Sequence, residues 1–480
     1  MRAPVPRRRA ERRGLRLWPV GPVLVLTFTA ALLVAAAVFF AGWDLLGARE
    51  LKPEHRIDSK TLFDLVKLSF GVVAGAGALV ALVVAYRRQR VDEDGALREA
   101  TRLHTERFTT AVSQLGQEPA AVRLGGVHAL AGLADDAPTR DLRQTCIDVL
   151  CAYLRLPYTA EADLPAGDAE AWHAYLALRE VRHTVIRLIR DHLGLEPEHP
   201  HSWQGHDFDF TGVTFDGGDF SAVTFSGGTV SFSDVTFSGG TVNFDGSTFS
   251  GGTVSFTGAR FSGGTASFAR STFSDGRVDF TGWRFSDGRV DFVGSTFSGG
   301  TVNFYGSEFS GGTVDFTASE FSDETVSFTD VTFSGSMVDF HGSTFSGGRV
   351  NFWRSTLSGG TINFDGTMFS GGTVNFPRTT FSGGTVNFAR TRFYGGMLLF
   401  GDAEFRGGML LFAGAEFRDG TVSFDGSTFS GSGVDFDGAT FFGGTINFST
   451  AHGVAPRDLI PSNGLPIGLS VPPEWYRAGS

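Results

Sequence analysis

Phenylalanine recurs in a fixed register along the second half of the chain. From Phe225 onward the intervals alternate between seven and five residues, so one series runs from Phe220 to Phe448 and a second from Phe225 to Phe441. The only replacement in either series is Leu357, which is also apolar. Val or Ile stands two positions before most Phe residues of the first series and a smaller residue before most of the second. Alternation by two is typical of strands. The pattern predicts short β-strands whose Phe side chains point inward.

Two uncharged apolar runs near the N-terminus predict transmembrane helices. They cover residues 18–43 and residues 68–86, and at about 1.5 Å per residue each is long enough to cross a hydrocarbon layer of about 30 Å. A signal peptide would have a shorter apolar core and no second run. Arginines precede the first run and follow the second, which favours a two-pass protein of the inner (plasma) membrane with both termini in the cytoplasm.

Gly71 and Gly75 in the second run have the spacing that lets two helices approach closely. Two arrangements remain open for them. The glycines can pack against the other span of the same chain or against a second copy, which would make the protein a homo-oligomer.

The section between the second run and the repeat predicts helices. Apolar residues at a three-four spacing continue to Leu115 and then occupy residues 118–136 and 141–154, and Pro157 stops this pattern. A last helix is expected from Asp168, a suitable N-cap, to Gly194. We expect these helices to form one small bundle.

The repeat resembles that of the pentapeptide-repeat proteins. Their unit has a small residue, then Asp or Asn, an inward Leu or Phe and two turn residues, and VNFDG at 242–246 followed by STFSG at 247–251 looks like two such units. The resemblance covers about residues 208–448 and implies a β-solenoid, a right-handed quadrilateral β-helix. An extra pair such as Gly240-Thr241 follows every second pentapeptide and lengthens the period to twelve. The apolar runs and helices ahead of the repeat are similar to those of membrane-anchored actinobacterial members.

Two coil sizes fit the repeat. A four-sided coil would take 24 residues and give roughly nine or ten coils, whereas a two-sided coil would take 12 and give twice as many, stacked about 4.8 Å apart. We favour the four-sided coil because the strict five-residue spacing at the start fits it, with Gly-Gly at the corners. The helices before Ser202 and the tail around Trp475 are candidates to cap the exposed ends.

Composition and charge agree with a repeated structure and add two further constraints. The chain has 48 Phe and 65 Gly among 480 residues, as a repeated environment would select. Its net charge is −11, yet its first 16 residues contain seven arginines and the repeat is acidic. Cys146 and Cys151 are its only cysteines, which excludes a disulfide framework and favours small core residues.

The residues do not predict an enzyme. Between residues 205 and 448 only His206 and His341 could act as a histidine base, and the many serines of the repeat are expected at corners. His199, His201 and His206 lack the carboxylate or thiol spacing of a metal site and are interpreted as part of a solvated linker. We therefore expect no catalytic residues, no cofactor and no bound metal.

Asp291, Asp315 and Asp339 are 24 residues apart and would stack in one column of a four-sided coil. In one interpretation, Asp and Asn at this position satisfy turns and keep the β-surface soluble. In the other, the column is an acidic interaction face that imitates a nucleic-acid backbone, as in family members that resemble duplex DNA and bind topoisomerases. Scattered arginines and a membrane anchor disfavour the second interpretation.

Together these features predict a non-catalytic, membrane-anchored protein that presents a cytoplasmic β-helix as a protein-binding or scaffolding surface. The expected partners are the lipid bilayer and a protein, without direct binding of nucleic acid. The alternatives are an acidic DNA mimic that binds a topoisomerase or another nucleic-acid-binding protein, and an enzyme or sensor built on the helices. The predicted divisions are a basic cytoplasmic tail (1–17), a two-span hairpin (18–86), a helical domain (87–200), the β-helix (205–448) and a C-terminal cap and tail (449–480).

Overall fold

The computed structural model describes residues 25–26, 29–30, 33, 36–37, 40–41, 44, 58–455, 459, 465 and 467–477. The chain divides into two compact units, residues 1–103 and residues 104–480.

A single long helix, α2 (Ser59–Leu115), contains the second apolar run. Among the described residues, no helix is sufficiently long and apolar to span a bilayer. The predicted transmembrane helix over residues 68–86 is therefore wrong. The helix there, α2, continues beyond the apolar run, and its charged residues leave it with little net apolar character as a whole. Most of residues 18–43, the first predicted span, lie outside the described residues.

Gly71 and Gly75 lie four residues apart on α2, and apart from the backbone of their own helix no described atom lies within 4 Å of a Cβ built on either glycine. Their role in helix packing stays a prediction, as does the location of the chain in the cell.

The predicted helices before the repeat are confirmed. They are α3 (Ala120–Asp135), α4 (Arg140–Leu154) and α5 (Ala169–Leu193), with a short 3-10 turn η2 (Glu161–Asp163) between α4 and α5. Asp168 caps α5 as predicted, because its side chain accepts hydrogen bonds from the backbone N–H groups of Glu170 and Ala171. Cys146 and Cys151 are buried and unpaired, and burial raises their pKa to about 11 and about 12.

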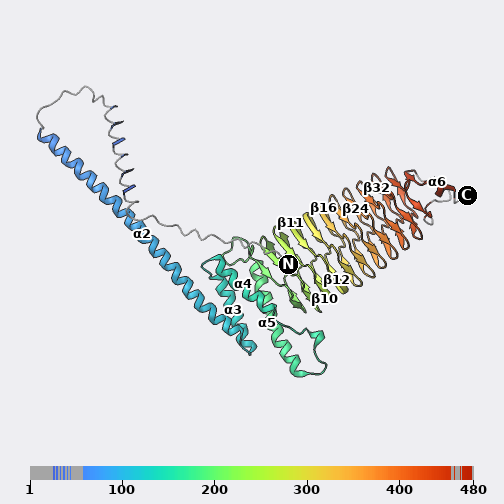
Figure 1. Ribbon diagram of the computed structural model, residues 1–480, viewed down its shortest axis with the longest axis horizontal. Coiled ribbons are helices and arrows are strands. Elements are labelled where there is room, and N and C mark those ends of the chain that lie inside the picture. Colours follow the sequence, from blue (N-terminus) through green and yellow to red (C-terminus); the bar gives the residue numbers. More distant parts are fainter. Residues whose placement is uncertain are drawn as a thin grey trace, which may run out of the picture. The chain divides into compact units, whose positions relative to one another are not determined.

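The repeat forms a β-solenoid of about 11 turns from residue 208 on, seen in Figure 1 as stacked rungs between α5 and α6. Sheet A consists of β1 (Phe208–Asp209), β4 (Thr224–Ser226), β5 (Thr229–Ser231), β8 (Thr248–Ser250), β9 (Thr253–Ser255), β11 (Thr272–Asp279), β13 (Thr296–Asn303), β16 (Glu320–Ser327), β19 (Thr344–Phe345), β20 (Arg349–Asn351), β23 (Met368–Phe369), β24 (Thr373–Asn375), β27 (Arg392–Phe393), β28 (Met397–Leu399), β31 (Glu416–Phe417), β32 (Thr421–Ser423), β35 (Thr440–Phe441), β36 (Thr445–Asn447) and β38 (Leu469–Ser470). Sheet B consists of β2 (Thr214–Phe215), β3 (Gly218–Asp219), β6 (Thr236–Phe237), β7 (Thr241–Asn243), β10 (Arg260–Ser267), β12 (Arg284–Asp291), β14 (Glu308–Phe309), β15 (Thr313–Asp315), β17 (Thr332–Phe333), β18 (Met337–Asp339), β21 (Thr356–Leu357), β22 (Thr361–Asn363), β25 (Thr380–Phe381), β26 (Thr385–Asn387), β29 (Glu404–Phe405), β30 (Met409–Leu411), β33 (Thr428–Phe429), β34 (Gly433–Asp435) and β37 (His452–Gly453).

Strand pairing sets the length of one turn. Neighbouring strands are parallel and pair Thr272 with Thr296 and Thr344 with Met368, so one turn takes 24 residues. A turn such as β19, β20, β21 and β22 contributes two short strands to each sheet, which agrees with the favoured four-sided coil. In some other turns, two such short strands form one continuous strand of eight residues, as in β11. The corners need positive φ: Gly372 has φ of +72°, and a Cβ there would lie 2.1 Å from a backbone oxygen.

Aromatic ladders fill the centre of the solenoid, as the sequence predicts. Each Phe stacks on its counterpart one turn away: the ring centroids of Phe292 and Phe316 are 4.8 Å apart, and those of Phe316 and Phe340 are 4.9 Å apart. The rings are almost parallel because the strands are parallel and in register. Leu357 occupies one ladder position between Phe333 and Phe381 and is equally buried.

Both ends of the solenoid are covered. At the C-terminal end, Trp475 of α6 (Pro473–Arg477) is 3% exposed, packs against Phe429 and Phe448 and donates a hydrogen bond to the carbonyl of Gly453. At the N-terminal end, α4 packs against β1 and α5 against β3. The two expected caps are therefore present, and they protect strand edges that would otherwise pair with other chains.

Candidate functional site

The structure brings Asp291, Asp315 and Asp339 into one column, as the sequence predicts for a 24-residue turn. They are aligned residues at the ends of β12, β15 and β18. Each carboxylate accepts a 2.9 Å hydrogen bond from the backbone N–H two residues further on. This is the turn-satisfying geometry of the first interpretation.

Cationic and amide groups offset the charge of this column. Nη2 of Arg289 lies 2.6 Å from Oδ2 of Asp315 and 3.3 Å from Oδ2 of Asp291. Asp339 instead accepts a 2.9 Å hydrogen bond from the amide of Asn363. Repulsion between like charges at strand spacing is thereby reduced, and the acidic surface available to a basic partner is smaller than three free carboxylates would make it.

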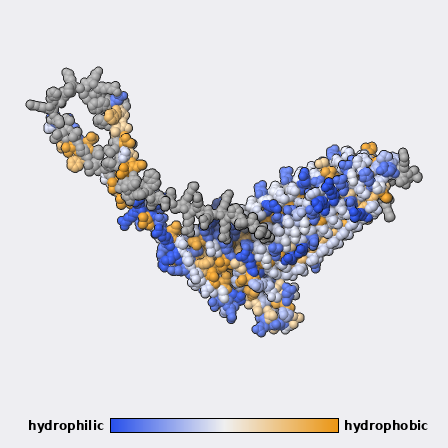
Figure 2. All heavy atoms as spheres, viewed as in Figure 1, coloured by the Kyte–Doolittle hydropathy of each residue, from blue (hydrophilic) through white to orange (hydrophobic). Residues whose placement is uncertain are grey.

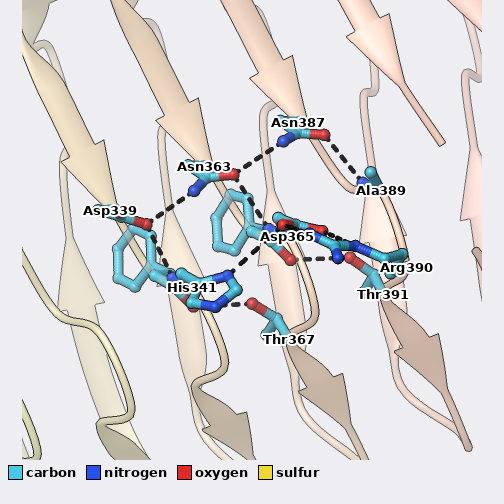
Figure 3. Close-up of polar contacts among 11 residues, drawn as sticks. Asp339, His341, Asn363, Asp365, Thr367, Asn387, Ala389, Arg390 and Thr391 are labelled. Atoms are coloured by element: carbon cyan, nitrogen blue, oxygen red, sulfur yellow. Dashed lines mark hydrogen bonds and ion pairs between the residues drawn. The ribbon is translucent and has the colours of Figure 1, made fainter. Parts of the chain in front are cut away.

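The same column continues as an asparagine ladder. The amide of Asn387 donates to Oδ1 of Asn363 at 2.9 Å, and Asn363 donates in turn to Asp339 (Figure 3). At the adjacent corner, Asp365 accepts a 2.9 Å hydrogen bond from Nε of Arg390 and lies 3.6 Å from Nδ1 of His341. These polar groups satisfy one another along the solenoid axis, which makes this face a regular polar surface.

One part of sheet A departs from this polar pattern. Met397 and Leu399 occupy outward positions of β28 that are Thr373 and Asn375 in the preceding turn. Met397 is 47% exposed. Sheet B shows the same change at Met409 and Leu411 of β30. The sequence carries this signal in GGMLLF, but the Phe register alone does not reveal it.

Aromatic residues enlarge the exposed region on sheet A. Tyr394, Arg418 and Phe442 follow the paired strands β27, β31 and β35. Tyr394 and Phe442 are 40% and 67% exposed, and the guanidinium of Arg418 lies 5.3 Å and 5.5 Å from their ring centroids. We call Tyr394, Met397, Leu399, Arg418 and Phe442 the apolar patch. The face of the solenoid seen in Figure 2 is mostly white to blue, with isolated hydrophobic groups.

A second group of polar residues joins the helices to the first turn of the solenoid. Asp216 stands where later turns have Ser and is nearly buried, and it accepts hydrogen bonds from the hydroxyls of Tyr158 at 2.5 Å and Tyr175 at 2.7 Å. Arg182 of α5 is buried, lies over the Tyr158 ring and donates to the carbonyls of Leu154 and Thr214. We call Tyr158, Tyr175, Arg182 and Asp216 the joint.

The carboxylate of the joint is held ionised. Burial opposes its charge, but the imidazole of His183 and the two tyrosine hydroxyls outweigh burial and lower the pKa of Asp216 to about 2. Burial also raises the pKa of Tyr158 and Tyr175, so both phenols stay protonated as donors. Sequence reasoning missed the joint because its members come from separate segments.

The three histidines before the repeat do not form a solvated linker as a group. His206 is 4% exposed, and its Nδ1 lies 3.0 Å from Oε1 of Gln144. Nδ1 of His201 lies 3.8 Å from the carboxylate of Asp135. The linker interpretation is therefore wrong for His206, which packs against α4.

Comparison with known proteins agrees with this architecture. Residues 210–254 match the family model described as pentapeptide repeats (9 copies). This match supports a pentapeptide-repeat protein. No curated protein and no solved structure matches the chain. The pentapeptide-repeat β-solenoid is a fold for protein interaction, and proteins built on it are generally non-catalytic.

Proposed function

We propose that the solenoid is a non-catalytic binding surface for a protein partner and that the apolar patch is its main contact. The observation that carries this proposal is that sheet A has Met397 and Leu399 in place of outward Thr and Asn and also carries the exposed rings of Tyr394 and Phe442. Tyr, Phe, Met and Arg are enriched where proteins bind one another. A regular polar solenoid has no folding requirement for these side chains on its outside, so binding is the better reason for them.

The alternative of an acidic DNA mimic receives less support. It would depend on Asp291, Asp315 and Asp339, whose carboxylates already accept backbone hydrogen bonds, and two of them share Arg289. Because these carboxylates already have hydrogen-bond or ion-pair partners, the apolar patch is favoured over the acidic column as the contact surface.

The test replaces two residues of the apolar patch by the residues that the regular repeat has at these positions. Met397→Thr with Leu399→Asn introduces the residues of the preceding turn, so the fold is expected to persist. A photo-reactive residue at Thr421, next to Met397 in β32, would first capture the partner in cells. We then expect the double variant to bind the purified partner at least about tenfold more weakly than the unchanged chain, as for interface residues that dominate binding.

The matched control is Met409→Thr with Leu411→Asn, the same change on sheet B. It should leave the affinity unchanged. If both double variants bind as tightly as the unchanged chain, the apolar patch is not the contact. If binding instead weakens steeply with salt and is displaced by duplex DNA, the acidic mimic is the better explanation.

A further inference from the structure

A polar cavity of about 400 Å³ lies in the helical section where it leads into the solenoid. Its walls come from the α3–α4 connection, the start of α4 and the segment before β1. The side chains that could meet a ligand there are Thr139, Arg140, Arg143, His199, Ser202 and His206. This volume is in the range of sites for small molecules.

The two arginines bring positive charge to the cavity wall. Arg143 donates to the carbonyl oxygens of Ala134, Asp135, Pro200 and Ser202 at 2.8, 3.2, 2.7 and 3.2 Å. Arg140 donates through Nη2 to the carbonyl of Gly205. The ion pairs found among the described residues include neither arginine. Since carbonyl oxygens are neutral, both guanidinium charges persist at the cavity wall.

The neighbouring histidine experiences this positive charge. Burial lowers the pKa of His206 to about 4, and the charges of Arg140 and Arg143 add to the shift, while the carboxylate of Asp207 opposes it. Oδ1 of Asp207 accepts a 2.7 Å hydrogen bond from the backbone N–H of Thr229. The nearby carboxylate of Asp135 is directed elsewhere, because it accepts a hydrogen bond from Trp203 at 3.2 Å and lies 3.1 Å from Nε2 of His192. Glu196 and Glu198 flank Pro197 in the sequence but are not part of the lining.

We propose that this cavity binds the phosphate group of a small phosphorylated molecule. Arg140 has N–H groups besides the one directed at Gly205, and the imidazole of His199 and the hydroxyls of Thr139 and Ser202 line the same space. A phosphate accepts several hydrogen bonds at once and gains from two cations. Because the walls come from both α4 and the segment that enters β1, a bound phosphate would hold the helices and the first turn together.

The experiment measures binding to the full chain by calorimetry at low salt. The probes are inorganic phosphate and glycerol phosphate in solution, acetate as a carboxylate, and phosphatidylcholine vesicles with and without phosphatidic acid. We expect saturable binding of the phosphate probes and at least about tenfold weaker binding of acetate. A preference for soluble phosphate or for phosphatidic acid would identify the source of the group, and either result supports the cavity.

Substitutions at Arg140 locate the binding. Arg140→Gln should weaken phosphate binding by at least about tenfold, whereas Arg140→Lys keeps the charge and should retain most of it. Arg284→Gln, on the exposed face of β12, is the matched control and should bind as the unchanged chain does. Thermal melting checks that each variant is folded. Lack of saturable phosphate binding, or equal binding by the Arg140→Gln and Arg284→Gln variants, would overturn the proposal.

Discussion

Buried hydroxyl groups complete the hydrogen bonding inside the solenoid at the scale of single residues. Ser343 is fully buried, and its Oγ donates to the carbonyl of Phe316 at 2.7 Å and accepts from the backbone N–H of Ser319 at 3.2 Å. Trp283 occupies an equivalent position, and its indole N–H donates to Phe256 at 2.7 Å. Ala259, Ala403 and Ala415 are buried at equivalent positions without a side-chain donor, so the repeat accepts a change of volume here with or without the hydroxyl.

Ser343→Ala tests how much one such hydroxyl contributes to the free energy of unfolding. The change removes both contacts of Oγ, but the backbone N–H of Ser319 still donates to the carbonyl of Phe316 at 3.1 Å. We therefore expect the free energy of unfolding to fall by about 0.5–1.5 kcal/mol. Chemical denaturation followed by circular dichroism measures it. Ser370→Ala is the control, because its Oγ makes only a 3.4 Å contact with the carbonyl of Phe345 from a partly exposed position. Equal effects of the two changes would contradict the role of the buried hydroxyl.

The lowered pKa of His206 predicts that the folded protein loses stability in mild acid. Its folded-state pKa of about 4 lies below the ordinary histidine pKa of about 6.5, so below pH 6.5 the unfolded chain binds a proton that the folded chain does not. Folding stability should therefore decrease as the pH falls from about 6.5 to about 4, by up to about 3 kcal/mol. Denaturation midpoints across this range measure it.

His206→Gln should remove most of this pH dependence. His341→Gln is the control, because the side chain of His341 is half exposed, and it should leave the dependence in place. A His206→Gln variant with the same pH profile as the unchanged chain would show that another group is responsible.

At the scale of elements, the joint orients α5 relative to the first turn of the solenoid. Asp216 is ionised and receives two tyrosine hydroxyls from chain segments 58 and 41 residues away. Hydrogen bonds to a charged group are stronger than those between neutral groups. The joint therefore couples the position of the helices to the first turn.

Tyr175→Phe removes one of these hydrogen bonds without a large change of shape. We expect a loss of about 1.5–3 kcal/mol in the free energy of unfolding, measured by chemical denaturation. Tyr305→Phe, at a side chain that is 47% exposed on the solenoid, should have little effect. Combining Tyr175→Phe with Asp216→Asn should cost less than the sum of the two single changes, since both remove the same contact. An additive result would mean that the two groups do not interact.

At the scale of the whole molecule, the solenoid is an array whose turns contact mainly their neighbours, so its ends need cover. Trp475 provides that cover at the C-terminal end by closing the aromatic ladders over Phe429 and Phe448. The polar outer faces keep the remaining surface hydrated.

Trp475→Ala should open the last turn while leaving the centre folded. Deleting a large buried side chain costs about 3–5 kcal/mol, and in a linear array this loss falls on the nearest turn. Hydrogen exchange is the measurement: the amides of β36 should lose protection, while those of β18 should keep it. Tyr476→Ala is the control, since Tyr476 is 58% exposed. Unchanged protection of β36 would show that Trp475 is not the cap.

Much of the solenoid could be predicted because its pattern is local and repeated. The inward Phe ladders and the column of Asp291, Asp315 and Asp339 follow from spacing along the chain. The cap at Trp475 follows from the need of an open solenoid end for cover. The expectation of a transmembrane helix over residues 68–86 was wrong: the helix there, α2, runs on through charged sequence to Leu115 and has little net apolar character as a whole. The apolar patch was overlooked because its residues lie outside the Phe register.

The sequence by itself determined the repeat, the inward side chains and the position of the helices, because each depends on residues a few positions apart. Only the tertiary structure decided that Arg289 lies between two aspartates, that Tyr158 reaches Asp216 and that Arg140 and His206 line one cavity. These contacts join residues separated by between 2 and 66 positions along the chain. They form only when parallel turns stack and the helices pack on the end of the solenoid, and spacing along the chain does not specify which side chains then meet.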